Sequence, residues 1–275
     1  MRTIIYNHKN SKIVGIRYGE GPQKVICLHG YGEDAQKFAF LEKSLGNQFS
    51  FYCINLPFHG ETNWQSTEAL SPAELSGIIE KIIEGDTENS PCFLLGYSLG
   101  GRIALSLYEQ NPKKYSKLIL LAPDGFTVNP WYWFATQTTV GNKLFRFTMK
   151  NPGWFFSLAK KLNQWKIIND SVFKFAHYYI DDANARELLY KRWTVLKNFK
   201  PDLAKIKTLA KENGTKIFLF YGRFDRIILP RKGKQFRSTI GNLGAVTILP
   251  AGHQLLNEKS LEEISKALIS FAGQP

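Results

Sequence analysis

The chain is poor in cysteine, and the cysteines it has are scattered. Cys27, Cys53 and Cys92 each lie inside a short apolar run, where a free cysteine behaves as a small hydrophobic side chain. The sequence contains no C-x-x-C pair and no Cys/His cluster with metal-ligand spacing. We therefore expect no metal site and no bound cofactor.

Long apolar runs are also absent. No stretch of about 18 uninterrupted apolar residues occurs. Residues 1–8 (MRTIIYNH) become polar too early for the apolar centre of a signal peptide. We therefore expect a soluble protein of the cytoplasm. A chain of 275 residues can form one large domain, or a domain with an insertion, without the help of disulfides or metals.

Acidic residues are few compared with basic ones. The chain has 23 Asp and Glu against 36 Lys and Arg, which gives a formal net charge of +13. Such a charge attracts anionic partners, which could be nucleic acid, a membrane surface or an acidic substrate. The lysines are spread along the chain and accompany no nucleic-acid-binding motif. We therefore interpret the charge as a basic solvated surface, expect no nucleic-acid partner, and keep membrane-surface contact as an alternative.

Short apolar runs alternate with segments of helical periodicity. Helices are predicted from Asp34 to Leu45, from Ser71 onward, where Ser71 and Glu74 form a capping box, and from Ser98 onward. The alternation predicts an α/β fold with an open, mostly parallel sheet and helices on both faces, in which ligands bind at the carboxyl ends of the strands. Strands are predicted at residues 3–6, 12–18, 24–28, 49–54, 92–95, 117–122, 216–221 and 245–249.

One serine lies between glycines where a predicted strand gives way to a helix. The window reads Gly96-Tyr97-Ser98-Leu99-Gly100, with the apolar run 92–95 before it and apolar residues at helical spacing after it. In this context G-x-S-x-G predicts a nucleophile elbow, a sharp turn that exposes the serine hydroxyl near a helix N-terminus. Ser98 is therefore the candidate nucleophile.

A serine hydroxyl reacts only when a base removes its proton. Two histidines follow Ser98, namely His177 and His253. His253 lies in a loop that leaves the predicted strand 245–249 and precedes the last helix, whereas His177 lies in an aromatic stretch typical of packing. We favour His253 as the base.

The base in turn needs an acid that orients it. Asp225 follows the predicted strand 216–221, the strand that comes just before that of the histidine. Asp124 follows the earlier strand 117–122 and, with a glycine after it, resembles a turn-forming aspartate. We favour Asp225 as the acid and keep Asp124 as the alternative.

Acyl transfer also needs two donors for the oxyanion that develops on the substrate. The backbone N–H of Leu99, which follows the nucleophile, is one candidate. The N–H of Tyr31, exposed by the turn at His29-Gly30, is the other. The ring of His29 is expected to bond loop backbone, and His59 is expected to stabilise a turn, so we assign neither to catalysis.

Residues 126–199 differ in composition from the rest. Residues 126–200 hold 18 aromatic side chains among 75 positions, against 14% over the whole chain, and 12 Lys and Arg against 4 Asp and Glu. The segment has helix-like pieces such as 182–197. We predict an aromatic-rich helical cap inserted over the strand ends, within an α/β core of residues 1–125 and 200–275. We expect most of the following aromatic residues to pack a small core of the cap and a minority of them to line a pocket: Trp131, Trp133, Trp154, Phe155, Phe156, Trp165 and Trp193.

These motifs together resemble the α/β-hydrolase superfamily. The resemblance covers residues from about 1 to 125 and from 200 to 275, and implies an eight-stranded, mostly parallel sheet with a cap inserted after the sixth strand. It also implies the triad order Ser98, Asp225, His253. Asn55 and Phe58 stand where Asp and Gly are common, a difference that bears on local loop geometry and not on the triad. The motifs are HGYG at 29–32, NLPFHG at 55–60, GYSLGG at 96–101, GRFDR at 222–226 and GH at 252–253.

The sequence therefore predicts a cofactor-independent serine hydrolase that cleaves a carboxylic ester or thioester of a small acyl substrate, either neutral or anionic. The same site could serve carbon–carbon bond hydrolysis or proton abstraction on a carboxylated substrate. An alternative of another class is a non-catalytic ligand-binding or membrane-associated protein on the same fold.

Overall fold

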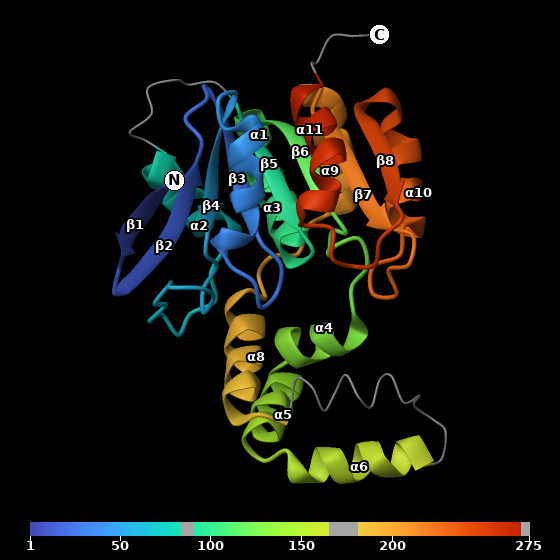
Figure 1. The fold of residues 1–275 in the computed structure, drawn as a ribbon. Coiled ribbons are helices and arrows are strands. Elements are labelled where there is room, and N and C mark those ends of the chain that lie inside the picture. The colour runs from blue at the N-terminus through green and yellow to red at the C-terminus, as the bar shows by residue number, and fades with distance from the viewer. Residues whose placement is uncertain (84–90, 165–180, 271–275) are drawn as a thin grey trace. The chain divides into compact units, whose positions relative to one another are not determined.

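The computed structural model describes residues 1–83, 91–164 and 181–270. The chain forms two compact units. The first comprises Met1–Ser66, Leu70–Thr127 and Asn198–Pro275, and the second comprises Thr67–Ala69 and Val128–Lys197. Each unit is described by itself below, and both are drawn in Figure 1.

The first unit is built on one eight-stranded sheet in the order β1-β2-β4-β3-β5-β6-β7-β8. β1 pairs with β2, and β2 with β4, in antiparallel fashion, and all other neighbours are parallel. The predicted α/β-hydrolase sheet is thus confirmed. The strands are β1 Arg2–His8, β2 Ser11–Tyr18, β3 Gln23–Leu28, β4 Phe49–Ile54, β5 Cys92–Tyr97, β6 Tyr115–Leu121, β7 Lys216–Gly222 and β8 Gly244–Leu249.

Helices cover both faces of this sheet (Figure 1). Neighbouring helices α2, α3, α9 and α10 pack side by side along one face, while η1, α1 and α11 cover the other. The bounds are η1 Ala35–Leu41, α1 Glu42–Leu45, α2 Pro72–Ile83, α3 Leu99–Gln110, η2 Pro112–Lys114, α9 Leu203–Asn213, α10 Arg231–Ile240, η3 Gly241–Leu243, η4 Glu258–Ser260 and α11 Leu261–Ile269.

The central strands are apolar on both faces, which explains why their sequences read as continuous hydrophobic runs. All six residues of β4 are buried, as are five of the six in β3. Successive side chains of a strand point to opposite faces. One set packs on η1, α1 and α11 and includes Val25, Cys27, Phe51, Cys53, Leu95, Ile119, Leu121 and Phe220.

Two local predictions need correction. The expected helix from Asp34 to Leu45 is a 3-10 helix over Ala35–Leu41, followed by a single α-helical turn. Asp34 does cap its start, because its side chain accepts the N–H of Gln36 at 2.9 Å. At α2, Ser71 Oγ accepts the N–H of Glu74 at 3.1 Å, but the Glu74 carboxylate bonds to residues of the β1–β2 turn.

That carboxylate explains why the capping box is only half formed. Oε1 of Glu74 lies 2.8 Å from His8 Nε2 and 2.8 Å from Lys9 Nζ. The side chains of His8 and Lys9 therefore compete for the Glu74 carboxylate with the single backbone N–H that a capping box would offer. The tertiary contact therefore replaces the local one.

The second unit is helical, with α4 Pro130–Gln137, α5 Thr139–Lys150, α6 Gly153–Gln164 and α8 Ala183–Val195. Asp182 caps α8 by accepting the N–H of Ala185 at 2.8 Å. Helices α4, α5 and α8 pack on one another through aromatic contacts. The ring centroids of Tyr132 and Trp193 lie 5.0 Å apart, and those of Phe145 and Trp193 lie 5.3 Å apart.

Three of the aromatic residues that were expected mostly to pack a core are exposed. Trp131, Trp133 and Trp154 are 78%, 50% and 39% exposed. Trp193 packs in the small core of the unit, and Trp165 lies outside the described residues. Aromatic composition alone does not distinguish a core from an exposed surface.

Candidate active site

Ser98 lies in a strained turn between β5 and α3. Its backbone has φ 49° and ψ −113°, a conformation that L-residues with a side chain rarely adopt. Backbone hydrogen bonds hold it there. The Ser98 N–H donates to Leu121 O at 2.9 Å, and Ser98 O accepts from Gly101 and Asp124, each at 2.9 Å. The turn places the serine beyond the carboxyl end of β5.

Two glycines make this turn sterically possible. A Cβ atom on Gly96 would lie 2.6 Å from Gly100 O, and one on Gly100 would lie 1.9 Å from Leu28 O. Both contacts are with backbone atoms that cannot move aside. The first turn of α3 therefore packs directly on the end of β3, which explains the G-x-S-x-G pattern in structural terms.

The structure brings His253 and Asp225 to Ser98. His253 Nε2 lies 3.1 Å from Ser98 Oγ, and His253 Nδ1 lies 2.7 Å from Asp225 Oδ2. A buried carboxylate facing Nδ1 is an acceptor, so Nδ1 carries the imidazole proton. Nε2 is then the nitrogen that can accept the proton of the serine hydroxyl.

Asp225 is held on both oxygens. Its side chain is fully buried, and Oδ1 accepts the N–H of Ile227 at 2.7 Å and of Ile228 at 3.0 Å. These two bonds fix the carboxylate so that Oδ2 points at the imidazole. A buried carboxylate with three donors keeps one orientation, which in turn fixes the ring of His253.

The loops that carry the acid and the base are joined by their backbones. The N–H of Arg223 donates to Leu249 O at 2.8 Å, and the N–H of Phe224 donates to Ala251 O at 2.9 Å. Gly222 allows this approach, because a Cβ atom there would lie 2.0 Å from Gly252 O. The short separation between acid and base thus follows from the parallel pairing of β7 with β8.

The side chain of the alternative acid, Asp124, has other partners than His253. Its Oδ1 accepts the N–H of Gly125 at 2.7 Å, and its Oδ2 lies 3.5 Å from Arg102 Nε. Asp124 is thus a turn aspartate paired with a helix α3 side chain. The alternative base, His177, lies outside the described residues.

The loop after β3 is held by two buried histidines. His29 Nε2 accepts the N–H of Leu56 at 3.1 Å, so His29 Nδ1 is the nitrogen that donates, to Gly30 O at 2.8 Å. His59 Nδ1 donates to Pro57 O at 2.9 Å, and the two rings lie 4.9 Å apart. The predicted structural roles of both histidines are confirmed.

Two residues in the next loop depart from the usual superfamily pattern. Asn55 Oδ1 accepts the N–H of Ala35 at 2.7 Å, which ties the loop to η1. Phe58 has φ 62°, a left-handed conformation in which glycine is the residue without steric cost. The loop therefore keeps a glycine-type backbone although it carries a phenylalanine.

The predicted oxyanion donors come from neighbouring strand ends. β3 pairs with β5 so that Leu28 lies opposite Gly96, and Tyr31 and Leu99 follow these two residues by three positions each. Leu99 is the first residue of α3, and the N–H groups of a first helical turn have no acceptor inside the helix. Both amides belong to the edge of the sheet that also carries Ser98.

Comparison with known proteins places the chain in a family. The model of the family described as serine aminopeptidase, S33, matches residues 20–260. The chain belongs to this family of hydrolases. Among curated relatives it is 23% identical over 253 residues to the uncharacterized hydrolase YugF of Bacillus subtilis, covering 91% of this chain and 90% of that protein.

Other similarities cover less of the sequence or show only the fold. The chain is 29% identical to the pimeloyl-[acyl-carrier protein] methyl ester esterase of Nitrosospira multiformis over 126 residues. This match covers 44% of the chain and 47% of that relative. A thermophilic esterase from Thermogutta terrifontis matches at TM-score 0.66 and 16% identity, over 97% of each chain. The thioesterase domain from the curacin biosynthetic pathway matches at TM-score 0.64 and 17% identity, over 98% of this chain and 99% of that one.

Sequence reasoning missed one acidic residue beside the site of this S33 hydrolase. Glu33 Oε2 accepts the N–H of Gly30 at 3.3 Å, and the Glu33 side chain also bonds to that of Gln254. Burial raises the pKa of Glu33 above its ordinary value, against the opposing effects of these hydrogen bonds and of Lys37 and His253 nearby. An acidic residue directly after the HGYG motif was the available signal.

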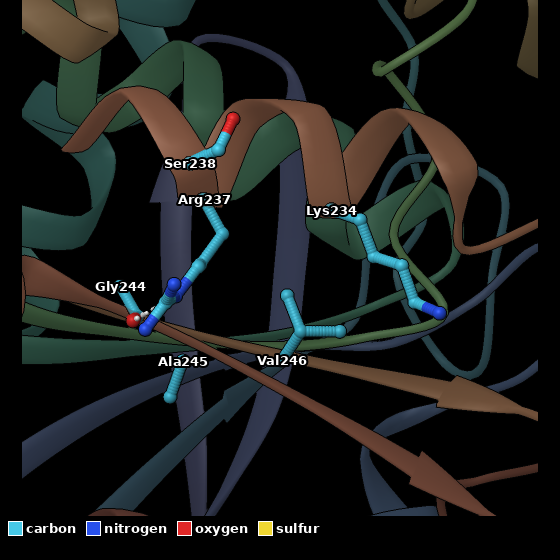
Figure 2. Close-up of a pocket in the computed structure, with 6 residues that line it drawn as sticks. All are labelled: Lys234, Arg237, Ser238, Gly244, Ala245 and Val246. Atoms are coloured by element: carbon cyan, nitrogen blue, oxygen red, sulfur yellow. Dashed lines mark hydrogen bonds between the residues drawn. The ribbon is translucent and has the colours of Figure 1, made fainter. Parts of the chain in front are cut away.

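The S33 hydrolase also has a basic hollow that is separate from the site (Figure 2). It has a volume of about 470 Å³ and is lined by Lys234, Arg237 and Ser238 of α10 and by the first residues of β8. Arg237 Nε donates to Gly244 O at 3.2 Å. His253 follows the opposite end of β8, so the length of a six-residue strand, roughly 20 Å, separates the hollow from the base.

In residues 1–83, 91–164 and 181–270, no group of three or more His, Cys, Asp or Glu side chains is placed to hold a metal ion. No helix in the described part of the chain is long and apolar enough to cross a membrane.

Proposed function

We propose that this chain is a serine hydrolase that cleaves a carboxylic ester or thioester through an acyl-enzyme on Ser98. The observation that carries the proposal is the continuous set of hydrogen bonds from Ser98 Oγ through His253 to Asp225, at 3.1 and 2.7 Å. Such an arrangement activates a serine that is otherwise a weak nucleophile.

In the first half-reaction, Ser98 Oγ attacks the acyl carbon while His253 Nε2 takes the hydroxyl proton. The carbonyl oxygen of the substrate becomes an oxyanion, for which the N–H groups of Leu99 and Tyr31 are the proposed donors. His253 then gives its proton to the leaving alcohol or thiol as the bond to the acyl carbon breaks. The acyl group is left as an ester on Ser98.

In the second half-reaction, water replaces the leaving group. His253 Nε2 takes a proton from the attacking water, and the new tetrahedral intermediate collapses with release of the carboxylic acid. Ser98 Oγ recovers the proton from His253. Throughout, Asp225 keeps Nδ1 protonated and stabilises the imidazolium in both halves of the reaction.

The comparisons support acyl chemistry and leave the acyl group open. An esterase and a thioesterase domain share the fold, and a partial relative acts on a methyl ester of an acyl-carrier protein. The family description names aminopeptidases, whose amide substrates would pass through the same acyl-enzyme. Esters and thioesters need less help for departure of the leaving group than amides do, and they are the substrates we propose.

The test measures turnover of p-nitrophenyl esters, acyl thioesters and aminoacyl p-nitroanilides by the full chain, with fluorophosphonate labelling alongside. Ser98→Ala and His253→Ala should each lower ester kcat by about 10³-fold or more, and Ser98→Ala should abolish labelling. Ser44→Ala, at an exposed serine, is the control and should change neither. If the wild-type protein is not labelled by the fluorophosphonate and turns over neither esters nor thioesters, the result would favour a non-catalytic binding protein.

A further inference from the structure

Two successive helices of the second unit carry exposed apolar side chains. On α5, Val140, Leu144 and Phe147 are 71%, 43% and 54% exposed, and their i, i+4, i+7 spacing puts them on one side of the helix. On α6, Trp154 and Leu158 are 39% and 45% exposed at i, i+4 spacing. These five side chains, from two successive helices, are together called here the α5–α6 surface.

The apolar row of α5 is additional to the side that packs inside the unit. Gly141, Thr148 and Met149 are the buried residues of α5, and α5 packs on α4 and α8. A helix that needs only a core contact shows a single apolar side and a polar opposite side. α5 instead shows a buried side and an exposed apolar row beside it.

Helix α6 lacks the packing that holds the other helices of the unit. α4, α5 and α8 contact one another, whereas α6 has no comparable contact with any helix or strand in the described part of the chain, and it extends away from them within the unit (Figure 1). Isolated helices of about 12 residues are marginal in water, and most gain stability by covering their apolar face. On α6, Ala159 is buried, and Trp154 and Leu158 are the large apolar side chains that remain exposed.

The charge around these rows is of one sign. Residues 128–164 contain five basic residues and neither Asp nor Glu. All five are exposed, and those on α5 lie along the side next to the exposed apolar row. The basic residues are Lys143, Arg146, Lys150, Lys160 and Lys161.

We propose that the α5–α6 surface binds to the headgroup region of an anionic lipid bilayer, with Phe147 and Trp154 entering the acyl boundary and the basic residues meeting lipid phosphates. Exposed aromatic and aliphatic residues flanked by Lys and Arg, without acidic residues, fit that boundary. This inference concerns the second unit alone and goes beyond the catalytic proposal.

Other occupants fit the surface less well. A nucleic acid or an acidic protein would meet the five positive charges but would offer no apolar phase for Val140, Leu144 and Leu158. A second copy of the chain packed on the same surface would oppose like charges, which is destabilising. A bilayer supplies both a negative surface and an apolar phase.

The experiment measures co-sedimentation of the full chain with vesicles of phosphatidylcholine alone, and with vesicles that also contain phosphatidylserine. Binding should require phosphatidylserine and weaken as salt rises from about 0.1 M to about 1 M, because the Debye length falls about threefold over this range. Phe147→Ser and Trp154→Ser should each weaken binding about tenfold or more, since both remove side chains that enter the acyl boundary. Ile5→Ser, at a residue that is 57% exposed on β1, is the matched control and should leave binding unchanged.

A charge-matched pair separates the surface from the net charge of +13. Lys143→Glu with Arg146→Glu should reduce binding far more than Lys232→Glu with Lys234→Glu, which changes the net charge equally on α10. Equal losses in the two double variants would overturn the proposal, as would binding that does not depend on Phe147 and Trp154. The proposal also fails if a soluble polyanion such as single-stranded RNA binds with the same dependence on all these variants as the vesicles do. Thermal unfolding of each variant verifies that the fold is kept.

Discussion

Replacing Asp225 with asparagine should reverse the hydrogen bond that orients His253. In the structure, Oδ1 of Asp225 accepts two backbone N–H groups, from Ile227 at 2.7 Å and Ile228 at 3.0 Å, and Oδ2 faces His253 Nδ1 at 2.7 Å. In Asp225→Asn the amide oxygen must stay on the two backbone donors, because an NH₂ group cannot accept them. The NH₂ group then faces Nδ1 and donates to it.

The magnitude follows from the tautomer that this reversal imposes. A donor facing Nδ1 moves the imidazole proton to Nε2, the nitrogen that lies 3.1 Å from Ser98 Oγ. Nε2 can then no longer accept the serine proton, and the imidazolium loses its counter-charge. We expect kcat to fall by about 10⁴-fold, which corresponds to about 5.5 kcal/mol in the activation barrier.

The fold should survive the same change. Both backbone hydrogen bonds to Oδ1 have an acceptor in the asparagine, so the free energy of unfolding should change by less than about 1 kcal/mol. The assay is the pre-steady-state and steady-state rate with a p-nitrophenyl ester, together with urea denaturation. Asp124→Asn is the matched control, since Asp124 pairs with Gly125 and Arg102. An Asp225→Asn rate within tenfold of wild type, or an equal loss in Asp124→Asn, would refute the reasoning.

Two further predictions concern ionisable groups, one half-buried and one buried. Because the pKa of Glu33 is raised in the folded state by burial, the stabilisation it provides is complete below its unfolded pKa and is lost as pH rises through its folded pKa. Glu33→Gln should therefore raise the melting temperature at pH 7 but not at pH 4, which thermal unfolding at both pH values measures. A lower melting temperature of the variant at pH 7 would contradict this prediction. The buried ammonium of Lys117 donates to the carbonyls of Ala267, Leu268 and Ser270 at 3.0, 2.8 and 2.6 Å, where α11 ends, and burial lowers its pKa to about 8. Lys117→Met should lower the free energy of unfolding at pH 7 by about 2 kcal/mol, measured by urea denaturation. An unchanged denaturation midpoint would contradict this prediction. The control is Lys259→Met, at an exposed lysine, which should not change the free energy of unfolding.

Much of the fold could be predicted because the first unit buries its strands on both faces. Runs such as 49–54 and 216–221 are continuous apolar stretches for that reason, and their ends agree with β4 and β7 to within one residue. The sequence pattern failed where tertiary contacts replace local ones. Glu74 bonds to the hairpin turn instead of completing its capping box, and the segment after Asp34 adopts a 3-10 helix tied to Asn55.

The candidate site was predictable to the extent that each of its side chains follows its own strand. Ser98, Asp225 and His253 meet because parallel strands bring their carboxyl ends to one edge of the sheet. The choice between Asp225 and Asp124 depends on hydrogen bonds that no spacing reveals. The role of Glu33 depends on the fold of its loop, because its partners are a local backbone N–H and a distant side chain.

The amino-acid composition did not predict which aromatic side chains of the second unit are exposed. A high aromatic content is compatible with a core and with an exposed surface, because the burial of each side chain depends on which helices pack together. Trp193 lies against two other rings, whereas Trp131 is 78% exposed. Only the arrangement of helices α4, α5, α6 and α8 distinguishes the two cases.

The most direct test of the central claim is the site of the covalent acyl group. The wild-type chain is mixed with a p-nitrophenyl ester, quenched in acid during turnover, digested, and analysed by mass spectrometry. The acyl mass should appear on Ser98, within the peptide that joins β5 to α3, and should be absent from Ser98→Ala. Ester turnover by the wild-type chain with no acyl group on Ser98 at any quench time, or with the acyl group on another residue, would contradict the proposed mechanism.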